Sequence, residues 1–171
     1  RLNLCFWDLV KPGPTAFISQ SGTMGDYLFE VSQAKGYGFS KIVSSGNQAS
    51  LDVCDYLEYL ADDDDTRAVA LYLEGVKDGR HFLEQAQSVS RDKPIVALKV
   101  GRYERSQAAV ASHTGALAGM ESAYNAAFHR AGIIRADTIE QLSSITPWKG
   151  FPVSAIFMGL VVMASNRPVL L

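Results

Sequence analysis

The sequence has few cysteines, little net charge and no long uninterrupted apolar run, and each absence excludes a class of protein. Its two cysteines, Cys5 and Cys54, lie far apart with no CxxC motif, which argues against a metal site or disulfide framework and for a reducing compartment. The formal net charge of −2 gives no sign of a nucleic-acid surface. The apolar run at 153–164 is shorter than the roughly 20 residues that span a bilayer. We therefore expect a cytoplasmic protein that binds neither nucleic acid nor membrane.

What the sequence does contain is a regular alternation of apolar runs and amphipathic stretches. Its 171 residues are 47% hydrophobic and 20% charged, the composition of an ordinary globular protein. Apolar runs typical of strands lie at 15–18, 42–43, 68–73, 94–98 and 133–134. The stretches between them carry apolar residues at helical spacing, beginning with Tyr27, Leu28, Val31 and Ala34. This alternation predicts an α/β fold, a three-layer flavodoxin-like domain whose parallel five-stranded sheet has the order 2-1-3-4-5.

Polar residues follow these predicted strands where each strand ends. Ser21 follows the first strand, Asn47 the second, Glu74 the third, and the loop around His113 follows the fourth. Open α/β sheets build their sites beyond the carboxyl ends of the strands. Because the first, third and fourth strands are neighbours in the order 2-1-3-4-5, we expect Ser21, Glu74 and His113 to meet in one crevice.

His113 is the most informative residue because its neighbours have almost no side chain. It lies in the run Ala111-Ser112-His113-Thr114-Gly115-Ala116-Leu117-Ala118-Gly119. Small residues leave space for a bulky charged group on the imidazole, and the glycines let the backbone bend around it. Neutral imidazole is a good nucleophile near pH 7, so His113 is a candidate phosphoryl carrier. Ser112, Thr114 and Gly115, together with Asn47, are candidates for supporting this loop. A solvated loop histidine is the alternative interpretation.

Two further features would suit the same chemistry. Ser21-Gly22-Thr23 opens a helix directly after a strand, so free backbone N–H groups and the positive end of the helix dipole can bind phosphate. An ordinary N-cap is the competing interpretation. Glu74 can hold one imidazole nitrogen so that the other faces the reacting phosphorus, or it can merely cap the next helix.

Other charged groups are given lesser roles. The acidic run Asp62–Asp65 between a helix and a strand is typical of a solvated turn, and we predict no metal site. Lys99, Arg102 and Arg105 precede the His113 loop and are read as a solvated basic loop that could assist with anions.

Three runs carry a resemblance to a known family: Phe17-Ile18-Ser19-Gln20-Ser21-Gly22, Val43-Ser44-Ser45-Gly46-Asn47 and above all Ala111–Gly119. They resemble the NDP-forming acyl-CoA synthetases, whose superfamily includes the succinyl-CoA synthetase α subunit. The resemblance covers about residues 13 to 146. It implies the phosphohistidine-bearing domain of an acid–CoA ligase with a flavodoxin-like fold. His113 matches the phosphorylated histidine, Glu74 the carboxylate that orients it, and Ser21-Gly22-Thr23 the start of the phosphate-binding helix.

In this family, acyl-CoA, phosphate and ADP or GDP are interconverted with free acid, CoA and ATP or GTP. An acyl phosphate forms, and its phosphoryl group passes to the histidine and then to the nucleotide. The resemblance therefore implies no permanently bound cofactor. CoA, the nucleotides, phosphate and Mg²⁺ enter as substrates or through partner domains.

The same resemblance sets expectations about partners. A complete enzyme has a CoA-binding Rossmann-like domain and an ATP-grasp domain, in the same chain or in another subunit, and we expect an oligomer. Residues 1–12 are read as a linker from an upstream domain, 13–146 as the ligase domain, and 147–171 as an apolar tail or the start of a further segment. An alternative is the ligand-sensing region of a protein lysine acetyltransferase, and a non-enzymatic binding module is a third. Acyl specificity and the choice between ADP and GDP are left open.

Overall fold

A single parallel sheet organises the chain. The computed structural model describes residues 10–101 and 121–145. Its strands are β1 (Pro12–Ser19), β2 (Phe39–Ser44), β3 (Ala68–Leu73), β4 (Ile95–Lys99) and β5 (Ile134–Ala136). They form one five-stranded sheet in the order β2-β1-β3-β4-β5, with every neighbouring pair parallel. The α/β flavodoxin-like fold and the strand order predicted from the sequence are confirmed.

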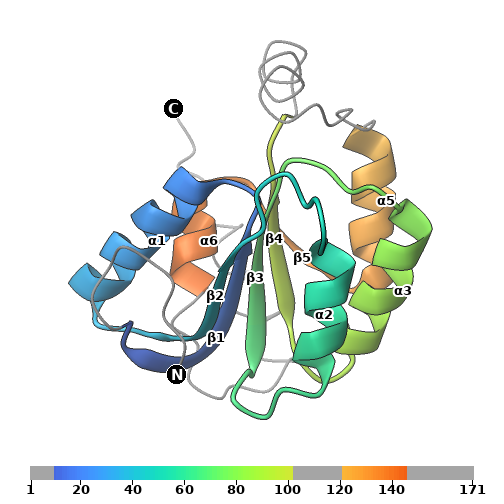
Figure 1. The fold of residues 1–171 in the computed structure, drawn as a ribbon. Helices are drawn as coiled ribbons and strands as arrows, with labels where there is room; N and C mark the ends of the chain where they lie inside the picture. The colour runs from blue at the N-terminus through green and yellow to red at the C-terminus, as the bar shows by residue number, and fades with distance from the viewer. Residues whose placement is uncertain (1–9, 102–120, 146–171) are drawn as a thin grey trace, which may run out of the picture.

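Helices cover both faces of this sheet (Figure 1). On one face lie α1 (Gly22–Lys35) and α6 (Ile139–Ile145), and on the other lie α2 (Val53–Ala61), α3 (Gly79–Ser90) and α5 (Glu121–Ala131). Each strand contributes side chains to the cores on both faces of the sheet, because successive side chains of a strand point to opposite faces. In β3, Val69 and Leu71 pack into the core beneath α2, α3 and α5, whereas Ala70 packs into the core beneath α1 and α6.

The apolar stripe expected on the first helix is only partly buried. Leu28 is fully buried and packs with Leu142 of α6, but Tyr27 and Ala34 are exposed. Gly25 and Ser32 complete the buried face instead, because small side chains let α1 lie close to the sheet. The stripe therefore identified the helix but not all of the residues that it buries.

Two glycines allow the first two strands to begin side by side. A Cβ built on Gly13 would lie 2.1 Å from the carbonyl oxygen of Gly38, and one on Gly38 would lie 2.1 Å from that of Lys11. No side chain fits such an approach, so both positions require glycine. In the described residues, no helix is long and apolar enough to cross a membrane.

Candidate functional site

The carboxyl ends of β1, β3 and β4 lie next to one another, as the strand order requires (Figure 1). Ser19 at the end of β1 pairs with Tyr72 of β3, and Leu73 at the end of β3 pairs with Lys99 of β4. The loops that follow these strands therefore begin at one edge of the sheet, which we call the carboxyl edge. Ser112, His113, Thr114 and Gly115, like Arg102 and Arg105, lie outside the described residues.

Helix α1 begins at this edge without a side-chain cap. Ser21 occupies the N-cap position, but its side chain makes no capping hydrogen bond, so the simple capping role considered for it is wrong. The Ser19 hydroxyl, which is fully buried, holds the turn instead: it donates to the Ser21 carbonyl at 2.6 Å and accepts from the Ser21 N–H at 3.1 Å. The Gly25 N–H donates to the Ser21 carbonyl at 3.2 Å, but the first-turn N–H groups find no acceptor in the Ser21 side chain. Gly22 and Thr23 are exposed at this helix start.

Gln20 joins the end of β1 to the end of β3. Its side-chain oxygen accepts from the backbone N–H groups of Glu74 at 2.5 Å and Gly75 at 2.9 Å, and its side-chain nitrogen donates to the Gly75 carbonyl at 2.7 Å. All three bonds are buried, which makes each more costly to break. Gln20 therefore fixes the turn that carries Glu74. Gln20 had no predicted role, because its partners lie 54 and 55 positions away in the sequence.

Glu74 is buried at the carboxyl edge, with 9% of its surface exposed. It does not cap the next helix, because α3 is capped by Asp78, whose Oδ1 accepts from the N–H groups of Arg80 and His81. The competing interpretation of Glu74 as a helix cap is therefore wrong. The orienting role expected of Glu74 stays a prediction, because His113 lies outside the described residues.

Lys99 departs from the expectation of a solvated basic loop. It is the last residue of β4, and only 2% of its surface is exposed. Its ammonium donates to the Val100 carbonyl and lies 4.7 Å from the centre of the Tyr124 ring. Burial lowers the pKa of Lys99, and the positive charge of Arg135 adds to this, although Glu121 and Glu74 attract the ammonium. Burial occurs because Lys99 points to the face that α5 covers.

The loop after β2 reaches the same edge. Asn47 is exposed there, between Gly46 and Gln48, both of which have positive φ. The Gln48 side-chain oxygen accepts from the Val53 N–H at 3.1 Å, and Lys77 donates to the Gln48 carbonyl. Lys77 thus connects the loops that follow β2 and β3. These bonds fix the backbone that presents Asn47.

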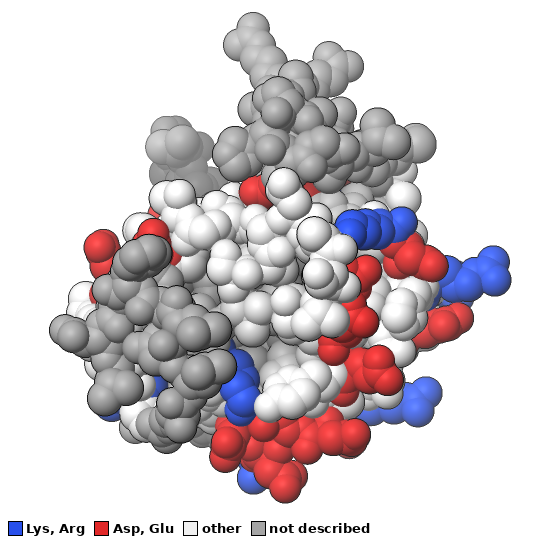
Figure 2. Space-filling model, in the orientation of Figure 1, with Lys and Arg blue, Asp and Glu red and all other residues white. Residues whose placement is uncertain are grey.

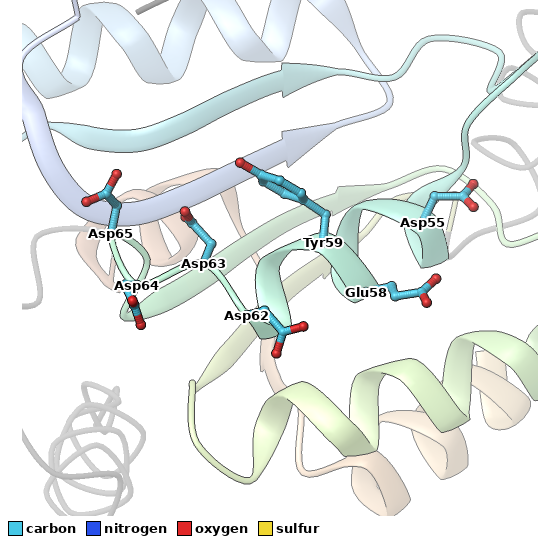
Figure 3. Close-up of a pocket in the computed structure, with 7 residues that line it drawn as sticks. All are labelled: Asp55, Glu58, Tyr59, Asp62, Asp63, Asp64 and Asp65. Carbon is cyan, nitrogen blue, oxygen red and sulfur yellow. The ribbon is translucent and has the colours of Figure 1, made fainter.

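An acidic hollow of about 760 Å³ extends along α2, from its first turn to the acidic turn at the opposite, amino edge of the sheet. Figure 2 shows acidic side chains gathered at that end of the molecule. Figure 3 shows the lining residues, whose carboxylates point in different directions instead of converging. They are Asp55, Glu58, Tyr59, Asp62, Asp63, Asp64 and Asp65. In the part of the chain that the structure describes, no group of three or more His, Cys, Asp or Glu side chains could hold a metal ion.

Within this run, Asp63 is not a simple solvated residue. Its carboxylate accepts from the Lys41 ammonium at 2.8 and 3.0 Å and from the Thr66 hydroxyl. Burial acts to raise its pKa, but these hydrogen bonds outweigh burial and hold the pKa below its ordinary value. Asp62, Asp64 and Asp65 are exposed, as expected of a turn.

Comparison with known protein families identifies the family of this chain. Residues 12–147 match the model of the succinyl-CoA ligase like flavodoxin domain. The chain belongs to this family. Because the match spans most of the chain, it includes the described carboxyl edge as well as the His113 loop.

The members most similar in sequence include two proteins of Pyrococcus furiosus. The chain is 52% identical over 140 residues to the acetate–CoA ligase [ADP-forming] I subunit alpha, covering 81% of this chain and 30% of that protein. It is 47% identical over 145 residues to the acetate–CoA ligase [ADP-forming] II subunit alpha, covering 85% of this chain and 32% of that protein. The chain thus spans about a third of the length of these relatives.

A solved structure agrees with this assignment. This structure is the acetyl-coenzyme A synthetase 1 of Ca. Korarchaeum cryptofilum, described as dinucleotide forming and in complex with phosphate and ADP. Its TM-score is 0.77 and its sequence identity is 39%, and the match covers 85% of this chain and 32% of the Korarchaeum chain. These relatives are larger ligases in which the succinyl-CoA ligase like domain is one part. They give no support to the acetyltransferase alternative.

Proposed function

We propose that this chain supplies the phosphohistidine-bearing domain of an ADP-forming acyl-CoA synthetase. The observation that carries the proposal is its similarity to acetate–CoA ligase α subunits over four fifths of its length. The described carboxyl edge supports it. A helix start that lacks a side-chain cap is held by Ser19, and the turn that carries the buried Glu74 carboxylate is held by Gln20.

In the proposed reaction, phosphate attacks the acyl-CoA carbonyl, the thioester bond breaks, and CoA leaves as the thiol. A nitrogen of His113 then attacks phosphorus, the bond from phosphorus to the acyl oxygen breaks, and the carboxylic acid leaves as carboxylate. ADP finally takes the phosphoryl group from the imidazole. Glu74 accepts a hydrogen bond from the second ring nitrogen of His113 and so orients the ring. The free N–H groups at the start of α1, with the Ser21 and Thr23 hydroxyls, bind the phosphate oxygens.

The proposal includes partners and substrates that this chain does not itself supply. CoA would bind a Rossmann-like domain, and the Mg²⁺-bound nucleotide an ATP-grasp domain, in the full-length protein or in a second subunit. A cytoplasmic location belongs to the same proposal and agrees with the buried free thiol of Cys54.

The test is phosphorylation of the full-length protein, with its partner subunit where there is one, by radiolabelled Mg-ATP. We expect a phosphoenzyme that is labile in acid and stable in base, as a phosphoramidate is. His113→Ala should abolish the label. His129→Ala, a change of an exposed histidine on α5, should leave it intact. Equal labelling of His113→Ala and the parent would overturn the proposal.

A further inference from the structure

A polar connection links the buried Lys99 to the turn that carries Glu74. The Lys99 ammonium lies over the Tyr124 ring, 4.7 Å from its centre. The Tyr124 hydroxyl in turn accepts a hydrogen bond from the Val76 N–H at 3.1 Å. Val76 lies two residues after Glu74. Tyr124 of α5 therefore contacts both the end of β4 and the turn after β3.

The same turn is held from its other side by Gln20. Gln20 bonds the backbone of Glu74 and Gly75, and Tyr124 bonds that of Val76, so consecutive residues are fixed from β1 and from α5. In addition, the Val100 N–H donates to the Leu73 carbonyl at 2.9 Å. The position of Glu74 thus depends on contacts from β1, β4 and α5.

The charges around Lys99 explain what its ammonium does at this edge. Glu121 of α5 and Glu74 attract it, and Arg135 of β5 repels it. Glu121 also pairs with Arg135 at 2.5 Å, so its negative charge is shared between two cations. An ammonium held out of water has a strong field, because the surrounding dielectric is low. Glu74 directly follows Leu73, which pairs with Lys99 across β3 and β4, so the ammonium and the carboxylate lie at the same end of the sheet. A positive charge placed there favours the ionised form of the carboxylate.

Lys99 follows two apolar residues on the same face of β4. Ile95 and Ala97, which point to the same face, are fully buried apolar residues. Burying a charged group costs free energy that an apolar side chain would avoid. A role of the Lys99 charge towards the Glu74 carboxylate would account for this cost in free energy.

Lys93, just before β4, provides a contrast at the amino edge. Its ammonium donates to the carbonyls of Leu60 at 2.5 Å and Asp63 at 2.9 Å. It therefore also holds backbone carbonyls from a half-buried position, but at the opposite end of the strand from Glu74. Lys93 is a structural lysine and a matched control for Lys99.

We propose that Lys99 and Tyr124 are positioning residues for the phosphoryl transfer, acting through Glu74. The Tyr124 hydroxyl anchors the Glu74 turn, and the Lys99 ammonium keeps the carboxylate ionised so that it can accept a hydrogen bond from the histidine. The inference rests on the proposed function. It adds two residues that act through the Glu74 turn.

The test measures single-turnover phosphorylation by Mg-ATP in the full-length protein with its partner subunit. Lys99→Met removes the charge and keeps the length of the side chain. We expect its maximal phosphorylation rate to fall about 10–100-fold, as when outer partners of a reacting group are removed. The ATP concentration for half-maximal rate should not change. Tyr124→Phe keeps the ring beside Lys99 but removes the anchor, and should cause a smaller fall.

The pH profile separates a positioning role from a structural one. Lys99→Met withdraws a positive charge from the end of the sheet that carries the Glu74 carboxylate, so the acidic limb of its rate profile should move to higher pH. Lys99→Arg keeps the positive charge and should restore the parental pH profile. Both variants keep the other groups around this position, which are Glu121, Arg135 and Tyr124. Lys93→Met should lower the melting temperature while leaving both the rate and the profile as in the parent.

These outcomes distinguish the inference from the proposed function. If His113→Ala is phosphorylated like the parent, the proposed function itself fails. If His113→Ala is inactive but folded Lys99→Met keeps the parental rate and profile, only the present inference is overturned. If Lys99→Met does not fold, the phosphorylation rate of Tyr124→Phe is the test. A rate equal to that of the parent overturns the inference, and a reduced rate supports it.

Discussion

At the scale of single residues, buried polar side chains gather at the carboxyl edge. Ser19, Gln20, Gln48, Glu74 and Lys99 are each at most 9% exposed and lie at or just beyond the ends of β1 to β4. Buried polar groups need hydrogen-bond partners, and such networks stiffen the backbone that they hold. These bonds therefore hold the backbone at the carboxyl edge in place.

The first residue-scale prediction concerns Glu74. Glu74→Gln should slow phosphorylation of the full-length protein about 10²–10⁴-fold, because an amide does not stabilise the developing imidazolium as a carboxylate does. Ser21→Ala should cost less, since the backbone N–H groups of α1 remain. Rapid-quench labelling measures these rates. Asp78→Asn is the control, because asparagine also caps helices well. A parental rate in Glu74→Gln would exclude an orienting role.

The second concerns Gln20. Gln20→Leu leaves the buried N–H groups of Glu74 and Gly75 without their acceptor. We expect the free energy of unfolding to fall by about 2–4 kcal/mol, measured by urea denaturation. Gln33→Leu, at an exposed position on α1, should change it by less than about 0.5 kcal/mol. Equal stability of the two variants would show that the bonds of Gln20 contribute little.

At the scale of elements, the start of the β1–β2 pair depends on glycine. Gly13→Ala and Gly38→Ala each place a Cβ within 2.1 Å of a backbone oxygen, so the strands must separate. We expect each to destabilise the chain by about 3 kcal/mol or more in urea denaturation. Gly79→Ala in the first turn of α3 meets nothing within 4 Å and should be neutral or slightly stabilising. Tolerance of alanine at Gly13 would contradict the observed strand approach.

The sequence predicted elements better than it predicted contacts. The strand at 68–73 was identifiable because a buried parallel strand is apolar on both faces. The helix α6 was not predicted, since its seven residues are too few for a clear apolar period. Glu74 could be placed from the strand that precedes it, but the bonds of Gln20 could not, because they join residues 54 and 55 positions apart.

The burial of Lys99 was missed for a similar reason. A lysine that ends an apolar strand has the same local sequence whether a helix or solvent lies beyond it. Its ring contact comes from Tyr124, which lies on α5 after the His113 loop. Tertiary packing therefore decided the environment of this charge.

At the scale of the whole molecule, the amino edge contributes pH-dependent stability. The pKa of Asp63 is below its ordinary value of 3.8 in the folded chain, so its pairing with Lys41 stabilises the fold above about pH 4 and is lost as the pH falls through the folded value. Lys41→Met should lower the free energy of unfolding by about 1–3 kcal/mol at pH 7. Urea denaturation should show this difference shrinking towards pH 3. Lys35→Met, at an exposed position on α1, should show no such trend.

A second prediction at this scale concerns turnover. The chain spans about a third of its ligase relatives, and we expect this chain by itself to make no ATP from acetyl-CoA, ADP and phosphate. A coupled luciferase assay measures ATP, and the full-length protein with its partner subunit is the positive control. Sustained ATP synthesis by the chain alone would show that it binds CoA and nucleotide unaided.

The exposed face of α2 has a practical consequence for measuring this chemistry. Tyr59 is 60% exposed and lies beside the acidic hollow, at the far end of the sheet from Glu74. A fluorophore attached through Tyr59→Cys would sit away from the carboxyl edge, and the native Cys54 thiol is buried, with a pKa raised to about 12 by burial and by Asp52. Selective labelling with a maleimide is therefore feasible once the other native cysteine is removed by Cys5→Ser. The labelled chain would report the binding of the proposed partner domains by fluorescence anisotropy while the carboxyl edge stays unmodified.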